Sequence, residues 1–318
     1  MSASRLGARL HALRARTSGN LQGMTLMVGS TACMALMYVA IRQVPGGMHP
    51  FQIAFFRNLI AILLLAAWYR GRLRAHLRTE HVRLHLLRGT LNVVAMLLFF
   101  YAVVITPLAD VAALGFAAPL FASALAIIVL RERVRWHRVA VIAFGFAGAV
   151  VILRPGFAQE TVGPVLLLIS AAIWSVTMLV IKVLARTDSS ITITVYMGAV
   201  MAPLAGIAAA FVWQWPDAEQ LAWLVLIAIL GTLGQVSLAQ SFRLAEVSAV
   251  LPLDFLKLVW GALLGFLIFA EVPDLFTWVG GVMIFSSTTY LALRESRTAR
   301  PAPAPAAAPG LSPEAPGR

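Results

Sequence analysis

Long runs of apolar residues, separated by short polar stretches, follow one another along most of the chain. A helix needs about 20 mostly apolar residues to cross the hydrocarbon core of a membrane. Because the runs are continuously apolar and do not alternate with polar residues, they predict helices rather than barrel strands. The sequence therefore predicts an all-α integral membrane protein with ten transmembrane helices, at about 21–41, 51–69, 86–106, 108–130, 138–153, 164–184, 191–212, 220–240, 247–270 and 275–293.

The composition supports lipid as the solvent of these helices. Hydrophobic residues make up 60% of the 318 residues and charged residues only 12%, against about 25% charged residues in a typical soluble domain. The net charge of +12 comes from arginines in short clusters between the apolar runs. This arrangement is typical of topogenic signals rather than of a phosphate-binding surface, so we expect a lipid bilayer and no nucleic acid as partner.

The basic residues also predict the orientation of the chain. With a cytoplasmic amino terminus, most arginines, including Arg83 and Arg88, fall in cytoplasmic regions. The outside loops then hold only Arg42 and Arg154 as arginines. We therefore expect a multi-pass protein of the cell inner (plasma) membrane with both termini in the cytoplasm.

The two ends of the chain differ from its apolar middle. Residues 1–20 form a basic cytoplasmic tail without a small-residue cleavage site, so we expect no removable signal peptide. We expect this tail to be frayed, with an interfacial amphipathic helix as the alternative. Residues 294–318 are rich in Ala and Pro near their end, which predicts a disordered cytoplasmic tail.

The predicted fourth and ninth helices resemble each other. In both, an acid opens a helix of small residues, at 108–113 and at 244–249, and a glutamate closes it, Glu132 and Glu271. Since five spans is an odd number, a second five-helix half enters the membrane upside down relative to the first. The sequence therefore predicts two inverted five-helix repeats, 21–153 and 164–293, joined by a periplasmic connection at 154–163, which is a common plan of alternating-access carriers.

Several short stretches carry a family resemblance over nearly the whole apolar part of the chain. These stretches are Pro50-Phe51-Gln52-Ile53-Ala54-Phe55-Phe56-Arg57, Leu87-Arg88-Gly89, Ala118-Pro119-Leu120-Phe121, the closing Glu132, and Glu271 followed by Trp278-Val279-Gly280-Gly281. With them the chain resembles the EamA-type members of the drug/metabolite transporter superfamily, which have ten helices in two EamA repeats, here about 23–153 and 164–293. One departure is Val141, because the position matching Gly280 usually carries glycine.

This resemblance implies a secondary active transporter that moves a small organic metabolite. The Phe-Phe-Arg and Leu-Arg-Gly stretches are similar to those of S-adenosylmethionine-uptake and riboflavin-uptake carriers. The resemblance thus implies S-adenosylmethionine, riboflavin, amino acids or related metabolites as substrates. It includes importers and exporters, so the direction stays open, as do the coupling ion and the oligomeric state, for which a homodimer is one option.

A charged pair within the ninth span is the first candidate for the substrate site. A charge at the bilayer centre costs on the order of 3 kcal/mol. Asp254 and Lys257 lie three residues apart on one helix face and can neutralise each other. Pro252 and Pro119 interrupt the corresponding helices of the two halves, which is a pointer to the central site of such carriers. The alternative is a structural ion pair, with prolines that only shape the helices.

Other polar residues within spans are further candidates. Arg57 could attract an anionic group or gate the cavity, but snorkelling to the outer interface or an ion pair is the favoured interpretation. Asn92, Trp174 and Gln235 could line a polar cavity, although helix–helix contacts explain such residues more often. The position of Glu132 and Glu271 at opposite membrane faces favours gating or interfacial pairing.

Two other function classes compete with a carrier. An intramembrane enzyme needs a nucleophile with a base, or clustered ligands, and the spans contain no Gly-x-Ser-x-Gly or His-Glu-x-x-His motif. A non-transporting assembly or sensor subunit would have a folded soluble domain. The single cysteine, Cys33, and six histidines outside the middle of the apolar runs favour no metal and no cofactor. We therefore expect no enzyme.

Overall fold

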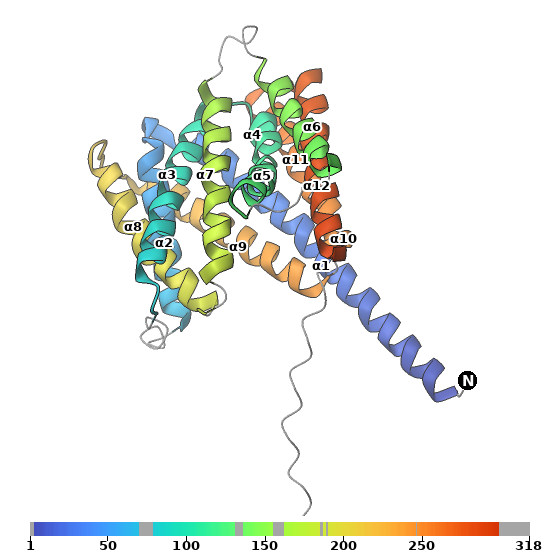
Figure 1. Cartoon of the computed structure of the whole chain (residues 1–318). Coiled ribbons are helices and arrows are strands. Elements are labelled where there is room, and N and C mark those ends of the chain that lie inside the picture. Colours follow the sequence, from blue (N-terminus) through green and yellow to red (C-terminus); the bar gives the residue numbers. More distant parts are fainter. Residues whose placement is uncertain are drawn as a thin grey trace, which may run out of the picture.

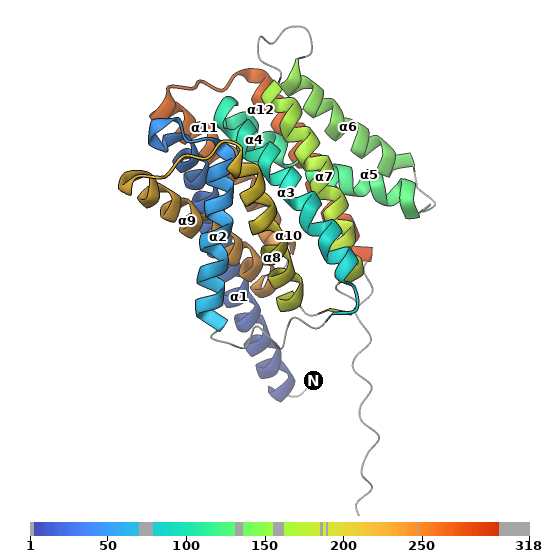
Figure 2. The same ribbon diagram turned by 90° about the vertical axis from the view of Figure 1, so that its left-hand side faces the viewer.

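The computed structural model describes residues 3–69, 79–130, 136–154, 162–184, 187–188, 190–245 and 247–298, and it contains no strand in these ranges. Figures 1 and 2 show the helices packed side by side in one bundle. The helices are α1 (Ala3–Gln43), α2 (Pro50–Tyr69), α3 (Val82–Ile105), α4 (Leu108–Gly115), α5 (Ala118–Leu130), α6 (Trp136–Leu153), α7 (Val162–Leu184), α8 (Ser190–Ala210), α9 (Ala218–Leu244), α10 (Val247–Val250), α11 (Leu256–Phe269) and α12 (Leu275–Thr298), with short 3-10 helices η1 (Pro45–Gly47) and η3 (Leu251–Phe255).

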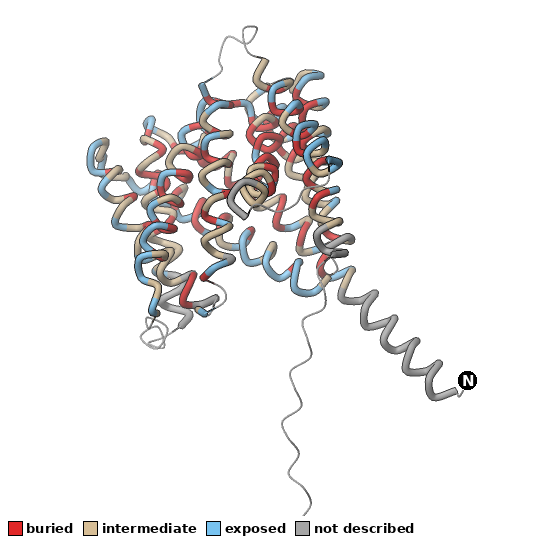
Figure 3. Tube along the Cα trace, in the orientation of Figure 1, coloured by how far each residue is buried: buried red, intermediate tan, exposed pale blue. Residues whose placement is uncertain are grey.

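Length and apolarity make this bundle a multi-pass membrane protein. Within the described residues, eight helical stretches are long and apolar enough to cross a membrane, and Pro50–Leu63 and Val195–Ala210 are shorter apolar stretches. Large apolar side chains also cover the outside of the bundle, among them Phe211, Leu267 and Phe266. Figure 3 shows the buried residues gathered on the inward sides of the helices, in particular around α4. The outward apolar side chains suit contact with lipid rather than water.

The structure corrects two expectations at the ends of the chain. Helix α1 begins at Ala3, so the basic stretch that we expected to be frayed is helical. This stretch is rich in Ala, Leu and Arg, which are strong helix formers. Helix α12 continues to Thr298, beyond the predicted boundary at residue 294. The remaining tail, 299–318, and Glu132 lie outside the described residues.

The predicted fourth and ninth spans are both broken in the middle. The fourth span consists of α4 and α5, with a turn at residues 116–117 directly before Pro119. The ninth consists of α10 and α11 joined by η3, which contains Pro252. Proline has no N–H to donate to the preceding turn and crowds it, so a helix changes course there.

The helix contacts repeat when the two halves of the chain are exchanged. Helix α1 packs on α9 and α11, and its counterpart α7 packs on α3 and α5. Likewise α2 packs on α9, while α8 packs on α3. The pairs α2–α8, α4–α11 and α6–α12 join counterparts directly. This is the contact pattern of two similar units related by an approximate twofold axis.

Helices α6 and α12 cross at very short range. A Cβ atom added to Gly280 would lie 2.5 Å from the carbonyl oxygen of Gly148, and one added to Gly148 would lie 2.7 Å from that of Gly280. Only residues without side chains permit this approach. The close contact of α6 with α12 is therefore made at Gly148, and not at Val141, the position that departs from the family pattern.

Candidate functional site

An internal cavity of about 450 Å³ lies among α1, α2, α3, α7, α8 and α9. Four residues that the sequence singled out line it together, although they come from four different helices: Arg57, Asn92, Trp174 and Gln235. The cavity is within the range of about 300–1,000 Å³ that small-molecule sites occupy. It is the part of the described structure that best fits a solute-binding site.

Arg57 lies at the wall of this cavity and not at the outer membrane interface. Its Nη1 donates to Asn58 Oδ1 at 3.4 Å, and no described carboxylate forms an ion pair with it. A Cβ added to Gly231 on α9 would come within 3.2 Å of the Arg57 Nε, so this glycine leaves room for the guanidinium. This position differs from the snorkelling that we favoured, and within the described residues no ion pair of Arg57 is present.

Arg88 also lines the cavity, and the sequence analysis missed it. Its side chain is only 6% exposed; Nη1 donates to the Ile193 carbonyl oxygen at 3.0 Å, while Nε has no partner. Helices α3 and α8 approach closely here, because a Cβ on Gly89 would lie 2.4 Å from Val200 Cγ1. We had counted Arg88 among the topogenic arginines; the Leu87-Arg88-Gly89 stretch was the signal that could have identified it.

Aromatic rings and methionines form most of the remaining wall. The ring of Phe99 lies 5.5 Å from that of Tyr38 and 5.8 Å from that of Trp174, centroid to centroid. Asn92 is 4% exposed, and its Oδ1 has no hydrogen-bond partner in the described chain. Six methionines complete the lining: Met34, Met37, Met96, Met178, Met197 and Met201. Flexible thioethers and flat rings adapt well to a planar solute.

Asp254 and Lys257 form an ion pair at 2.6 Å but do not line this cavity. Asp254 lies in η3, at the broken part of the ninth span, and η3 packs on α1. The structure thus brings the two residues together as a pair without placing them in the cavity wall with the other candidates.

One end of the bundle, which we call the Arg42 end, is held by Arg42 and its partners. Arg42 Nη1 lies 2.5 Å from Glu271 Oε1, its Nε donates to the Val103 carbonyl oxygen at 2.7 Å, and its Nη2 donates to the Thr106 carbonyl oxygen. The second carboxylate oxygen of Glu271 accepts the Leu108 N–H at 2.9 Å. Glu271 therefore ties α1 and the start of α4 to the end of the ninth span.

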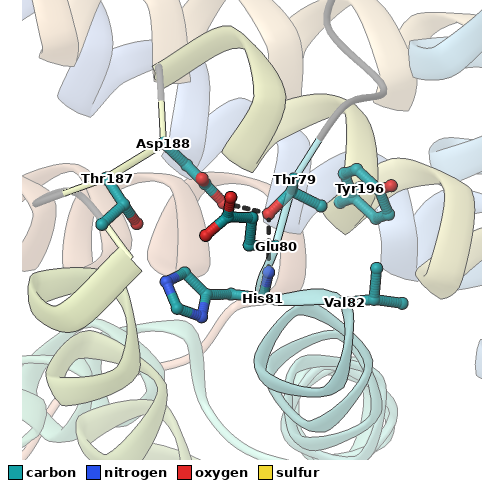
Figure 4. A pocket seen from close by; sticks show the side chains of 7 residues that line it. All are labelled: Thr79, Glu80, His81, Val82, Thr187, Asp188 and Tyr196. Carbon is teal, nitrogen blue, oxygen red and sulfur yellow. Dashed lines mark hydrogen bonds between the residues drawn. The ribbon is translucent and has the colours of Figure 1, made fainter.

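The opposite end, which we call the His85 end, is held by Asp188 between α7 and α8. Its Oδ2 lies 2.6 Å from His85 Nε2 and accepts the Thr79 hydroxyl at 2.7 Å. The His85 ring stacks on Tyr196 at 4.5 Å. The hydrogen bond from Thr79, followed by that from His85, lowers the pKa of Asp188. Figure 4 shows Asp188, Thr79 and Tyr196 around a hollow at this end.

The cavity lies between these two ends. On α1, Tyr38 lines it one turn before Arg42, and on α3, Arg88 lines it one turn after His85. The described residues contain no group of three or more His, Cys, Asp or Glu side chains that could hold a metal ion. The site is therefore a polar and aromatic chamber, with a cluster of polar contacts beyond each of its ends.

The model of the EamA-like transporter family matches residues 21–154 and 161–293, which together cover most of the chain. The chain belongs to this family. The two-repeat membrane fold and the transporter function implied by the resemblance are thereby confirmed. The two matched repeats begin at residues 21 and 161, and their second helices begin at Pro50 and Ser190, the same offset in sequence. We therefore pair positions at this offset in the first two helices of each repeat.

This correspondence applies to the walls of the EamA cavity. Ser30 and Ser170 are equivalent, and each donates across the bundle: Ser30 to the Gly234 carbonyl oxygen at 2.7 Å, and Ser170 to that of Ala95 at 2.7 Å. The cavity-lining pairs Met34 and Trp174, and Arg57 and Met197, are equivalent too. The cavity is thus built from the same positions of both repeats, with different side chains.

Relatives of this EamA protein are named as transporters. An S-adenosylmethionine uptake transporter of Rickettsia felis is 32% identical over 254 residues, covering 79% of this chain and 85% of the relative. A riboflavin transporter of Brucella anthropi is 30% identical over 258 residues, covering 79% and 90%. A pseudopaline exporter of Pseudomonas aeruginosa is 29% identical over 273 residues, covering 82% and 93%. These names describe transport of small molecules in both directions.

A solved crystal structure has the same fold. It aligns with a TM-score of 0.55 at 21% identity and covers 89% of this chain and 99% of its own. At this identity the match concerns the fold alone.

Proposed function

We propose that this protein is a secondary active transporter that moves a small organic metabolite across the bacterial inner membrane by alternating access. The supporting observation is the cavity, which lies between two polar end clusters and is lined by equivalent positions of the two repeats. Alternating-access carriers hold their substrate at the interface of two repeats. S-adenosylmethionine and riboflavin, the solutes named for the relatives, are the first to test.

The proposal includes ten transmembrane helices in two inverted repeats. The eight long apolar stretches and the two shorter ones of α2 and α8 together give ten. Figure 1 supports the inversion, because α1 enters from the lower end of the view and its counterpart α7 starts at the upper end. With the arginine-rich regions inside, both termini are cytoplasmic and the His85 end faces the cytoplasm. Reporter fusions that place the two termini on different sides of the membrane would refute this topology.

The residues proposed to contact the solute are Arg57, Asn92, Trp174 and Gln235, with Arg88 added by its position. Asp254 and Lys257 form an ion pair outside the cavity lining, so their proposed role is to hold the broken ninth span rather than to contact the solute. Pro119 and Pro252 give the broken spans their bends, and Glu271 holds the Arg42 end.

Transport by purified protein in proteoliposomes tests the proposal. Wild-type vesicles preloaded with unlabelled riboflavin or S-adenosylmethionine should accumulate the same labelled solute by exchange. Arg57→Gln should reduce this exchange at least about tenfold, the effect of losing a contact worth about 1.4 kcal/mol. Arg243→Gln is the matched control, because it removes the same charge from an exposed position on α9.

The outcomes separate the function classes. Exchange that survives Arg57→Gln unchanged would exclude the cavity as the pathway. Chemical conversion of the solute without accumulation would instead indicate an enzyme. The Asp254→Asn variant, which leaves Lys257 unpaired, separates a structural role of the pair from a substrate role. If the pair is structural, the variant has a lower thermal stability; if Asp254 contacts the substrate, the variant has a changed apparent KM.

A further inference from the structure

The charges around the cavity are unbalanced. Arg57 and Arg88 both line it, and its described lining contains no Asp or Glu. Neither guanidinium forms an ion pair with a described carboxylate. Arginine stays protonated even when buried. The nearby carboxylate of Asp254 does not compensate, because it is paired with Lys257 at 2.6 Å. The chamber therefore carries an excess of positive charge.

Two buried polar atoms at the same wall have no partner within the described chain. They are Arg88 Nε, a donor, and Asn92 Oδ1, an acceptor, on residues that are 6% and 4% exposed. A buried polar group without a hydrogen bond is costly, so such groups mark places where a ligand or water completes the bonding. Both residues lie on α3 one turn apart, so a solute that carries an acceptor for Arg88 Nε next to a donor for Asn92 Oδ1 can reach both.

The two charged residues of the wall come from one repeat, whereas ring faces come from both. The positively charged residues Arg57 and Arg88 belong to α2 and α3 of the first repeat. At the position equivalent to Arg57, the second repeat has Met197. Trp174 of the second repeat and Phe99 provide ring faces for a flat molecule. A solute that fits this lining has a planar ring system and a negatively charged group.

We infer that the cavity of this carrier selects flat aromatic solutes that bear an anionic group, and that it disfavours solutes with a net positive charge such as S-adenosylmethionine. This inference rests on the proposed function and specifies its substrate class. The rings of Tyr38, Phe99 and Trp174 could also receive a sulfonium cation. Two unpaired guanidinium groups in the same chamber oppose that cation, whereas they attract a carboxylate or phosphate.

Two matched pairs of compounds isolate the charge from the shape. S-adenosylhomocysteine lacks the sulfur-bound methyl group of S-adenosylmethionine, so its sulfur is a neutral thioether instead of a positively charged sulfonium. Flavin mononucleotide differs from riboflavin by the addition of a phosphate. Thermal unfolding of the purified protein is measured with each compound over a range of concentrations, since a ligand of the folded state raises Tm by an amount that grows with the logarithm of its concentration divided by its Kd. In each pair the more negative member should bind about tenfold more tightly or better.

Variants then assign the preference to the arginines. Arg57→Gln should remove most of the difference within each pair, and Arg243→Gln should leave it unchanged. Arg88→Gln should act like Arg57→Gln; if it fails to fold because it loses the Ile193 contact, Arg57→Gln and the wild-type comparison still decide.

Equal binding within the pairs, tighter binding of the more positive member, or no stabilisation by any of the four compounds would overturn the inference. A loss of preference in Arg243→Gln would do the same. The proposed transport function is judged separately: exchange of S-adenosylmethionine in proteoliposomes would sustain it while this inference fails. Preferential binding of the more negative member of each pair, without exchange of any solute, would sustain the inference and refute transport.

Discussion

The two ends of this bundle are closed by different means. At the Arg42 end, a nearly buried guanidinium holds a carboxylate and two backbone carbonyl groups, and α6 and α12 cross nearby with backbone atoms in contact. At the His85 end, a single carboxylate between α7 and α8 accepts hydrogen bonds from a histidine and a threonine. Several helices and a permanently charged arginine hold the Arg42 end. At the His85 end, the described contacts centre on Asp188, which lies on the short connection between α7 and α8. The His85 end should therefore open at the lower cost.

The largest effect is expected where α6 and α12 cross. Gly280→Ala places a Cβ 2.5 Å from the Gly148 carbonyl oxygen, so the helices must separate. Overpacking of this kind costs on the order of 2 kcal/mol, and Tm in detergent should fall by several degrees. Gly29→Ala is the control, because a Cβ there has no neighbour within 4 Å. If Gly280→Ala unfolded at the wild-type temperature, the Arg42 end would not depend on this crossing.

A smaller effect is expected for the ion pair of the same end. Glu271→Gln removes the negative charge that Arg42 holds at 2.5 Å but keeps an oxygen that accepts a hydrogen bond, so the loss is about 1 kcal/mol, the difference between a charged and a neutral hydrogen bond. In a Cys33→Ser background, a cysteine at the buried position Thr106 should then react severalfold faster with a membrane-impermeant maleimide.

The matched control at this end is Asp274→Asn. Asp274 pairs with Arg154, but its side chain is 42% exposed, and exposed pairs contribute little. Asparagine also keeps the oxygen that accepts the Thr277 N–H at 2.9 Å. Equal labelling in both variants would mean that Glu271 is not a specific fastening of the Arg42 end.

The smallest effect is expected at the His85 end and depends on pH. The pKa of Asp188 is lower in the folded chain than its ordinary value, so its ionised form adds stability above that ordinary value of about 4. The contribution is lost as the pH falls through the lowered folded-state pKa. Wild type should therefore be more stable than Asp188→Asn at pH 7, and the difference in Tm should vanish in acid. A difference that persists unchanged at pH 3 would assign it to another cause.

Helix positions and the broken spans could be predicted because they depend on local properties. Apolar runs of sufficient length gave the helices, and Pro119 and Pro252 lie at the two breaks. Polar residues within apolar runs face the interior of a membrane protein. This simple rule accounts for the residues that meet at the cavity: Arg57, Asn92, Trp174 and Gln235. The same rule suggested Asp254 and Lys257, which the structure keeps beside the cavity as a pair.

The features that could not be predicted from the sequence have physical reasons as well. Arg88 lies near a helix end, where arginine is a common topogenic residue, so its burial was hidden by a plausible surface role. The partner of Glu271 is 229 residues away in sequence, and no local pattern connects it with Arg42. Met197 and the other methionines are ordinary members of apolar runs, and only their convergence on one chamber distinguishes them.

The equivalent hydrogen bonds of Ser30 and Ser170 have a consequence for the energetics of transport. Each fastens the first helix of one repeat to the third helix of the other. A motion in which the repeats trade conformations keeps both fastenings, so the energy gap between the two resulting forms comes only from residues that break the symmetry, such as Arg57 opposite Met197. A carrier of this kind has little built-in preference for one direction of transport. The solute gradient, rather than the protein, then decides the direction in which the solute moves.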